Sequence, residues 1–205
     1  MIVEGTSLRE IAHEHPGTFA RYHRGFEALR AYTAGGRDGI HDVDVEVRWG
    51  PPGSGKTRYF FEKYGPELFI VSPPRDRNGS VWFDGFDGAV HSAVLFDDFY
   101  GWYRYNNLLR ICDRYPFNVE IKGGTVPMSA LSICFTCNSH PKYWFNNGRC
   151  DLAALERRIS RIIYVGDNTY PTEESWVSSD KYRSFLPSWA SIDSATSSVN
   201  AHVVL

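Results

Sequence analysis

One segment constrains the fold of this chain more than any other, a glycine-rich loop that reads Gly-Pro-Pro-Gly-Ser-Gly-Lys-Thr. It matches the pattern G-x-x-x-x-G-K-T, in which backbone N–H groups wrap a phosphate and glycines leave room for its close approach. Apolar and polar residues alternate from Val43 to Trp49 before the loop, as in a strand with one wetter face, and a helix is expected from Thr57 to Tyr64 after it. A chance glycine-rich turn does not account for this strand, loop and helix. The predicted phosphate site comprises Gly50, Pro51, Pro52, Gly53, Ser54, Gly55, Lys56 and Thr57.

The chemistry of such a loop depends on charged and hydroxyl groups at its end. Lys56 is expected to reach the β- and γ-phosphates, and the Thr57 hydroxyl to hold Mg²⁺. An acidic strand end is also needed, because the metal must be held and the attacking water oriented. The apolar segment 94–96 is followed by Asp97, predicted to assist the metal, and Asp98, predicted to polarise the water. The alternative is an ordinary pair of surface aspartates that closes a strand.

Two further positions each allow two interpretations. Asn138 follows the apolar segment 131–136, so its amide is placed to touch the γ-phosphate and the lytic water, but asparagine is also a common turn residue. Lys122 and Gly123 stand at the tip of a hairpin predicted from Asn118 to Val126. The functional interpretation is a cation that grips a nucleic-acid phosphate. From the sequence alone, a solvated hairpin lysine is favoured.

The order of the elements predicts an α/β chain in three parts. Residues 1–41 contain two helices: a Ser7–Glu10 capping box begins the first, and a stripe of apolar side chains follows the second. This unit is too thin to hold a core alone and is expected to pack on the next domain or a neighbouring subunit. Residues 42–166 alternate strands with helices, which predicts a P-loop NTPase with a mostly parallel sheet flanked by helices. Residues 167–205 are rich in serine and are expected to form a loosely ordered tail, with Trp176 and Trp189 able to dock.

Charge and hydropathy narrow the setting. The formal net charge is −2, so nucleic-acid binding has to rest on a few placed cations rather than on a basic surface. No apolar run approaches the ~20 residues that span a bilayer, and the amino terminus does not resemble a signal peptide. These features predict an intracellular chain with no membrane partner.

Two metal-like patterns are better explained without a metal. Cys134 and Cys137, followed by His140, suggest zinc, but the first cysteine lies in a strand, where a spacing of three points side chains to opposite faces. The four cysteines are therefore interpreted as free thiols. His13 and His15 resemble the metal pair of a rolling-circle nuclease, but the chain contains no Tyr-x-x-Lys to supply its nucleophile.

Five blocks of the sequence together resemble the replication-associated proteins (Rep) of circoviruses and cycloviruses. They read Trp-Gly-Pro-Pro-Gly-Ser-Gly-Lys-Thr from residue 49, Phe-Asp-Asp-Phe-Tyr-Gly-Trp from 96, Leu-Arg-Ile-Cys-Asp-Arg-Tyr-Pro from 109, Glu-Ile-Lys-Gly-Gly-Thr-Val-Pro from 120, and Cys-Asn-Ser from 137. The resemblance runs in order from about residue 16 to 165. The second and fourth blocks are not general features of P-loop proteins.

The resemblance implies a superfamily 3 helicase of the AAA+ type, which uses ATP and Mg²⁺ to move 3′ to 5′ along single-stranded DNA as a homohexamer in the host nucleus. It identifies Asn138 with the family's sensor residue and Lys122 with the lysine of its pore hairpin. Arg157 and Arg158 fall where the family carries its arginine finger, and Arg149 is a further candidate. A solvated helix face is the other interpretation of Arg157 and Arg158.

The family's amino-terminal nuclease has no counterpart in the sequence, so a helicase half without nicking activity is expected. Two other functions stay open. One is a P-loop ATPase that acts as an oligomerisation module without unwinding activity. The other is a stand-alone ATPase or small-molecule kinase that ignores DNA.

Overall fold

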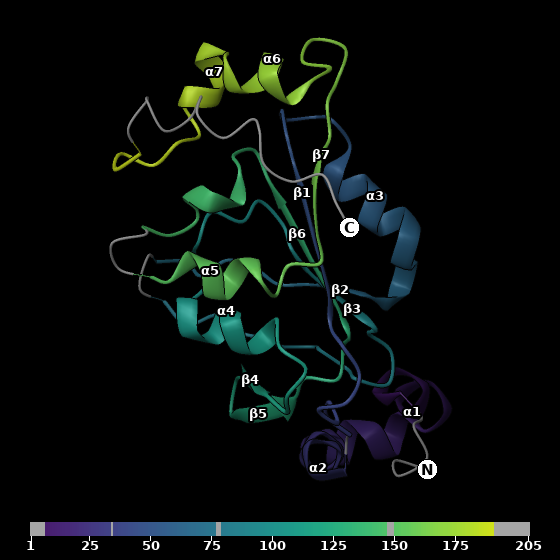
Figure 1. Ribbon diagram of the computed structural model, residues 1–205. Helices are drawn as coiled ribbons and strands as arrows, with labels where there is room; N and C mark the ends of the chain where they lie inside the picture. The colour runs from purple at the N-terminus through teal and green to yellow at the C-terminus, as the bar shows by residue number, and fades with distance from the viewer. Residues whose placement is uncertain (1–6, 34, 77–78, 147–149, 191–205) are drawn as a thin grey trace.

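A five-stranded parallel sheet forms the centre of the protein (Figure 1). The computed structural model describes residues 7–33, 35–76, 79–146 and 150–190. The sheet strands are β1 (Asp44–Trp49), β2 (Leu68–Ile70), β3 (Ala93–Phe96), β6 (Ser132–Cys137) and β7 (Arg161–Tyr164). Their order is β2-β3-β6-β1-β7, and every neighbouring pair is parallel. The predicted fold class is confirmed, and the carboxyl ends of β1, β3 and β6 meet at one edge of the sheet.

Helices cover both faces of this sheet. Helix α3 (Lys56–Tyr64) lies on one face, and α4 (Tyr105–Ile111) and α5 (Leu152–Glu156) lie on the other (Figure 1). In β3, Ala93 and Leu95 belong to the small apolar cluster under α3, whereas Val94 and Phe96 belong to the large cluster on the other face. Because both faces are buried, β3 is apolar at every position.

The expected wetter face of β1 is confirmed at Asp44 and Arg48, which are half-buried, but not at Glu46. Glu46 is only 3% exposed, because α3 covers the strand at this point. Its carboxylate accepts hydrogen bonds from Arg48 Nε at 2.7 Å, Arg161 NH2 at 3.0 Å and Lys63 Nζ at 3.4 Å. The buried negative charge of Glu46 is tolerated because cations from three elements pair with its carboxylate and donate hydrogen bonds to it.

Helices α4 and α5 are short. Helix α4 ends at Ile111, and α5 ends at Glu156. The residues beyond α5 are drawn into the sheet, since Ser160 N donates to Val45 O and its hydroxyl accepts from Val45 N.

The expected hairpin is confirmed as β4 (Asn118–Ile121) and β5 (Gly124–Pro127), paired antiparallel outside the main sheet. Ile121 pairs with Gly124, so Lys122 and Gly123 alone form the turn. Gly123 has φ +94°, a conformation that favours glycine. In Figure 1 the hairpin lies at the end of the molecule near α2, away from the carboxyl edge of the sheet.

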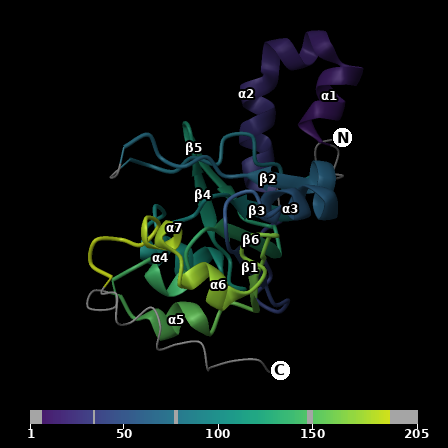
Figure 2. The same cartoon turned by 90° about the horizontal axis from the view of Figure 1, so that it is seen from above.

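The amino-terminal helices form as predicted. The Ser7–Glu10 capping box begins α1 (Leu8–Glu14), and α2 (Pro16–Thr33) follows (Figure 2). Tyr22 and Leu29 in the apolar stripe of α2 are 56% and 44% exposed, so this stripe is only partly covered within one chain. Tyr32 belongs to the same stripe, but its side chain lies outside the described residues.

A buried cation joins the helical unit to the rest of the protein. Arg37 is 4% exposed, and its guanidinium donates to the carbonyl oxygens of Ala130, Ile111 and Asp113 at 2.6 to 3.0 Å. Burial lowers the pKa of Arg37 to about 10, which leaves it charged at neutral pH. The contact also caps the carboxyl end of α4, where a cation is favourable.

The expectation of a loosely ordered tail was wrong for residues 167–190. This segment forms α6 (Glu173–Val177) and α7 (Asp180–Arg183) above the carboxyl edge of the sheet (Figure 1). Trp176 and Tyr182 are 0% and 1% exposed and pack into the large core. Burial of these two aromatic side chains outweighs the serine-rich composition on which the expectation rested. Residues 191–205 lie outside the described residues.

None of the described helices is both long and apolar enough to cross a membrane.

Candidate nucleotide site

The glycine loop links the end of β1 to the start of α3, as the sequence predicted. Gly50 has φ +145°, and a Cβ atom there would lie 2.3 Å from the carbonyl oxygen of Val165. Gly55 precedes the first residue of α3 and adopts φ +88°, the left-handed conformation that lets the loop enter the helix. A loop of this kind before the positive end of a helix offers backbone N–H groups to an anion.

Lys56 lies at the centre of this loop and is 5% exposed. Its ammonium donates to Pro51 O at 2.7 Å, Gly50 O at 3.1 Å and Asn138 Oδ1 at 3.0 Å, and it lies 3.4 Å from Ser54 Oγ. Burial lowers the pKa of Lys56, while Asp98 and Asp97 act to raise it. The predicted lysine and the predicted asparagine therefore meet directly, although 82 positions separate them.

The first aspartate lies beside the threonine of the loop. Thr57 Oγ1 donates to Asp97 Oδ1 at 2.7 Å, and Thr136 Oγ1 donates to the same oxygen at 2.5 Å. Hydroxyl and carboxylate oxygens are the donors that Mg²⁺ prefers. The residues present thus fit the predicted metal role of Thr57 and Asp97. Thr136, on the neighbouring β6, was not singled out from the sequence.

Asp98 adopts a strained backbone conformation at the end of β3. Its φ is +46°, and it is the one non-glycine with positive φ among the described residues. Its N–H donates to Thr136 Oγ1 at 2.9 Å, which holds the turn. Partial removal from water, and then the neighbouring Asp97, raise the pKa of Asp98, although its side chain still reaches the surface. The two aspartates therefore differ in their surroundings.

Asn138 is fixed on both sides by residues that sequence reasoning missed. Its N–H and Nδ2 donate to the Tyr100 hydroxyl at 3.2 and 2.6 Å, which directs Oδ1 at Lys56. Burial, and then Asp98, raise the pKa of Tyr100 to about 12, so this hydroxyl stays neutral. Trp176 Nε1 donates to Asn138 O at 2.9 Å. Tyr100 belongs to the Asp-Asp-Phe-Tyr block, so the sequence held a signal for it. Trp176 belongs to the segment that was predicted to be a loosely ordered tail.

The structure does not bring Lys122 to this site. Lys122 Nζ forms an ion pair with Asp84 at 3.0 Å, its side chain is 76% exposed, and its N–H donates to the other Asp84 oxygen at 2.7 Å. The hairpin lies at the other end of the molecule from the phosphate loop (Figure 1), so a ligand bound by Lys122 occupies a separate site.

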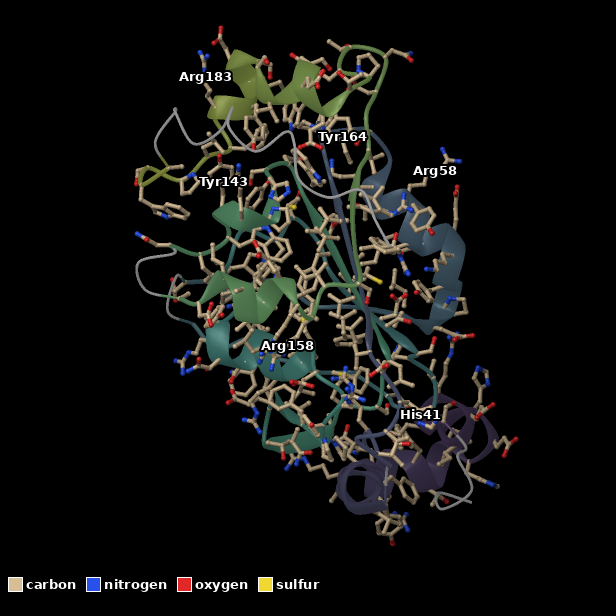
Figure 3. All side chains as sticks on the ribbon, in the orientation of Figure 1. His41, Arg58, Tyr143, Arg158, Tyr164 and Arg183 are labelled. Carbon is tan, nitrogen blue, oxygen red and sulfur yellow. The ribbon has the colours of Figure 1, made fainter. Side chains whose placement is uncertain are left out.

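The two adjacent arginines after α5 differ in their surroundings. Arg158 donates to Asp113 Oδ2 at 3.1 and 2.7 Å and to Ala154 O at 2.6 Å, and its side chain is 18% exposed. Figure 3 shows it beside α4, on the side of the sheet opposite Arg58 of α3. Arg157 is exposed. The guanidinium of Arg158 is therefore occupied by partners in its own chain, whereas the exposed Arg157 is the better candidate to contact a neighbouring subunit. Arg149 lies outside the described residues.

The cysteine interpretation is confirmed. Cys134 and Cys137 are 1% and 0% exposed, and they belong to the separate apolar clusters on the two faces of the sheet. Because the two thiols lie on opposite faces of the sheet, they cannot bind the same ion. His13 and His15 lie at the exposed carboxyl end of α1.

Comparison with known proteins gives the family context. No protein-family model matches the chain. The chain is 38% identical over 174 residues to the replication-associated protein of Porcine circovirus 2, and 35% identical over 159 residues to that of Human associated cyclovirus 1. The chain is similar to these Rep proteins over most of its own length. The two matches cover 84% and 78% of the chain, which spans about half the length of either Rep relative, 54% and 56%.

Solved structures add a more distant likeness. The Hsp104-ADP complex from S. cerevisiae is 16% identical with a TM-score of 0.44, covering 83% of this chain and 37% of that one. NtrX from Brucella abortus in complex with ATP is 15% identical with a TM-score of 0.42, covering 78% and 45%. The fold of this chain is assigned from its own strand order and phosphate loop.

Proposed function

We propose that this chain is the ATP-driven helicase unit of a viral replication initiator, which moves 3′ to 5′ along single-stranded DNA as a hexameric ring in the host nucleus. One observation carries the proposal: Lys56, Thr57, Asp97 and Asn138 meet at one edge of the sheet through direct hydrogen bonds. The similarity to viral Rep proteins supports a role of this ATPase site in DNA replication.

Each residue of the site has a place in ATP hydrolysis. Lys56 supplies a buried positive charge to the β- and γ-phosphates, where charge develops in the transition state. Mg²⁺, held through Thr57 and Asp97, supplies further charge neutralisation when ATP is bound. Asp98 and the Asn138 amide orient the attacking water. Tyr100 keeps the amide in the required orientation because it occupies Nδ2 and leaves Oδ1 facing the lysine.

The position of Arg157 supports the proposed assembly. This residue is exposed at the end of α5, whereas the phosphate loop joins β1 to α3. In the proposed ring it serves the ATP of a neighbouring subunit, as fingers supplied in trans do. The exposed apolar side chains of α2, Tyr22 and Leu29, provide a surface for the same assembly.

Binding of DNA is assigned to the hairpin turn formed by Lys122 and Gly123. A ring of subunits places one exposed Lys122 per chain around a central strand, which concentrates positive charge that the chain as a whole lacks. Gly123 keeps the turn tight, so the lysine projects from a rigid tip.

Replacing Lys122 with alanine is expected to reduce the stimulation of ATP turnover by single-stranded DNA to near onefold, because the phosphate contact at the hairpin is lost. The measurement is the ratio of turnover with and without a saturating single strand. Lys181→Ala on the exposed side of α7 is the matched control and should keep the wild-type ratio. Stimulation that persists in Lys122→Ala contradicts the role given to the hairpin.

The alternative is a P-loop ATPase that acts as an oligomerisation module without unwinding activity. The exposed stripe of α2 suits that function as well. A module of this kind hydrolyses ATP and assembles, but single-stranded DNA does not stimulate it.

A further inference from the structure

Helices α6 and α7 lie above the carboxyl edge of the sheet, where the phosphate loop begins (Figure 1). Trp176 of α6 and Tyr182 of α7 are buried, and their ring centroids are 5.6 Å apart. Trp49, the last residue of β1 before the loop, has its ring 6.4 Å from that of Tyr182. The two helices therefore pack directly against the strand that leads into the phosphate loop.

The turn between β7 and α6 determines where this segment lies. Asp167 Oδ1 accepts hydrogen bonds from the N–H groups of Thr169 and Tyr170 at 2.8 and 2.7 Å. The hydroxyl of Tyr164, which Figure 3 shows below α6, donates to Tyr170 O at 2.8 Å. At Gly166 a Cβ atom would lie 2.7 Å from Tyr170 O, so only a glycine lets the turn close this tightly. Helix α6 consequently returns over the sheet in one defined place.

Two polar groups of the segment contact the backbone directly after β6. Trp176 Nε1 donates to Asn138 O at 2.9 Å, although 38 positions separate the two residues. Burial raises the pKa of Tyr182, whereas a hydrogen bond with the backbone of His140 acts to lower it. The His140 ring packs edge-on against Trp49, with ring centroids 5.1 Å apart. The stretch from Asn138 to His140 is therefore held between β1 and the two helices.

Trp176 holds the main chain of Asn138, whereas the other partners of this residue hold its side chain as well. Tyr100 accepts from the N–H and from Nδ2, and Lys56 donates to Oδ1. Asn138 is 7% exposed. If the indole N–H is lost, a buried carbonyl oxygen is left without its donor, which is unfavourable. Relief of that cost by a backbone shift would move the amide relative to Lys56.

We propose that Trp176 is a positioning residue for ATP hydrolysis, which acts through the main chain of Asn138. The inference rests on the proposed function and deepens it, since it adds the α6–α7 segment to the hydrolytic unit. Trp176 acts behind Asn138 rather than on ATP itself. A misplacement of about 1 Å in a site can cost about 10²-fold in rate. The effect falls on turnover and not on nucleotide binding, because the loop and Lys56 bind the phosphates.

The test replaces Trp176 with 3-benzothienylalanine, in which a sulfur atom takes the place of the indole N–H and the ring keeps its shape. ATP turnover is expected to fall about 10-fold to 100-fold, while the affinity for a fluorescent ATP analogue stays as in wild type. The same replacement at Trp189 is the matched control, since Trp189 is 43% exposed, and it should change neither quantity. Wild-type turnover in the Trp176 variant, or an equally large loss of nucleotide affinity, overturns the proposal and leaves the proposed function standing.

A second background separates positioning from a general loss of stability. Asn138→Ala keeps the carbonyl that Trp176 contacts but removes the amide. In this background the sulfur replacement should still lower the free energy of unfolding. It should not lower the residual turnover further, because the two residues act as one unit. A further large loss of turnover overturns the proposal, since Trp176 then acts by another route. Absence of ATP turnover in the wild-type chain is instead a failure of the proposed function.

Discussion

Replacing Arg157 with alanine is expected to lower ATP turnover by about 10³-fold or more, the range measured for arginine fingers. The reason is positional: Arg157 is exposed at the end of α5, whereas Arg158 is committed to Asp113 and Ala154 of its own chain. Binding of ATP should change little, because a finger acts on charge that develops in the transition state. Steady-state turnover and a fluorescent-nucleotide affinity measure the two effects separately.

Arg158→Ala and Asp113→Ala are the matched variants for this prediction. Both break the same partly buried pair, so both should lower the free energy of unfolding by a similar amount, about 1–3 kcal/mol. Neither should produce the large loss of turnover. The assignment is wrong if Arg158→Ala loses turnover as a finger does while Asp113→Ala and Arg157→Ala remain active.

A mixing experiment tests whether Arg157 acts in trans. Subunits with Arg157→Ala retain Lys56, and subunits with Lys56→Ala retain Arg157. When the two variants are mixed, interfaces that join the intact lysine of one chain to the intact arginine of the other are complete. Turnover of the mixture should exceed that of either variant alone. No recovery, with assembly shown by light scattering, contradicts the shared site.

Replacing Lys56 with alanine is expected to lower ATP turnover by about 10³-fold, because a preorganised cation is removed from the phosphates. Its ammonium is also the donor to Pro51 O and Asn138 Oδ1, so the loop loses the group that organises its centre. Turnover is measured with the labelled nucleotide present at saturation, so that weaker binding is not mistaken for slower chemistry.

Arg58→Ala controls for disturbance of α3. Arg58 lies two positions after Lys56 on the same helix, its side chain is 81% exposed, and its ion pair with Glu62 is a surface contact. Such pairs contribute little to stability, so this variant should fold and turn over ATP as wild type does. Full activity of Lys56→Ala means that the glycine loop is not the hydrolytic site.

The sequence was sufficient for the parts of the site that local chemistry determines. The glycine loop needs backbone conformations that favour glycine, as Gly50 and Gly55 show. An apolar strand followed by Asp97 can also be recognised from the sequence alone. Asn138 was open to two interpretations from the sequence, and the contact of its Oδ1 with Lys56 places it beside the phosphate loop.

The remainder depended on tertiary contacts that no local pattern contains. Arg157 and Arg158 are equivalent in the sequence, and only the pairing of Arg158 with Asp113, 45 positions away, separates them. Residues 167–205 were expected to form a loose tail because of their serine content, and only the possible docking of Trp176 pointed to the buried segment that the structure shows. Glu46 was expected on the wetter face of its strand. Its burial could not be predicted, because its three cationic partners come partly from other elements.

Strand displacement is the most direct test of a motor that moves along DNA. A short duplex with a single-stranded 3′ tail and one with a 5′ tail are each incubated with the chain, ATP and Mg²⁺, and release of the labelled strand is followed. We expect ATP-dependent displacement from the 3′-tailed duplex, little from the 5′-tailed one, and none with Lys56→Ala. ATP turnover without displacement of either duplex contradicts the account and favours an ATPase that assembles but does not unwind.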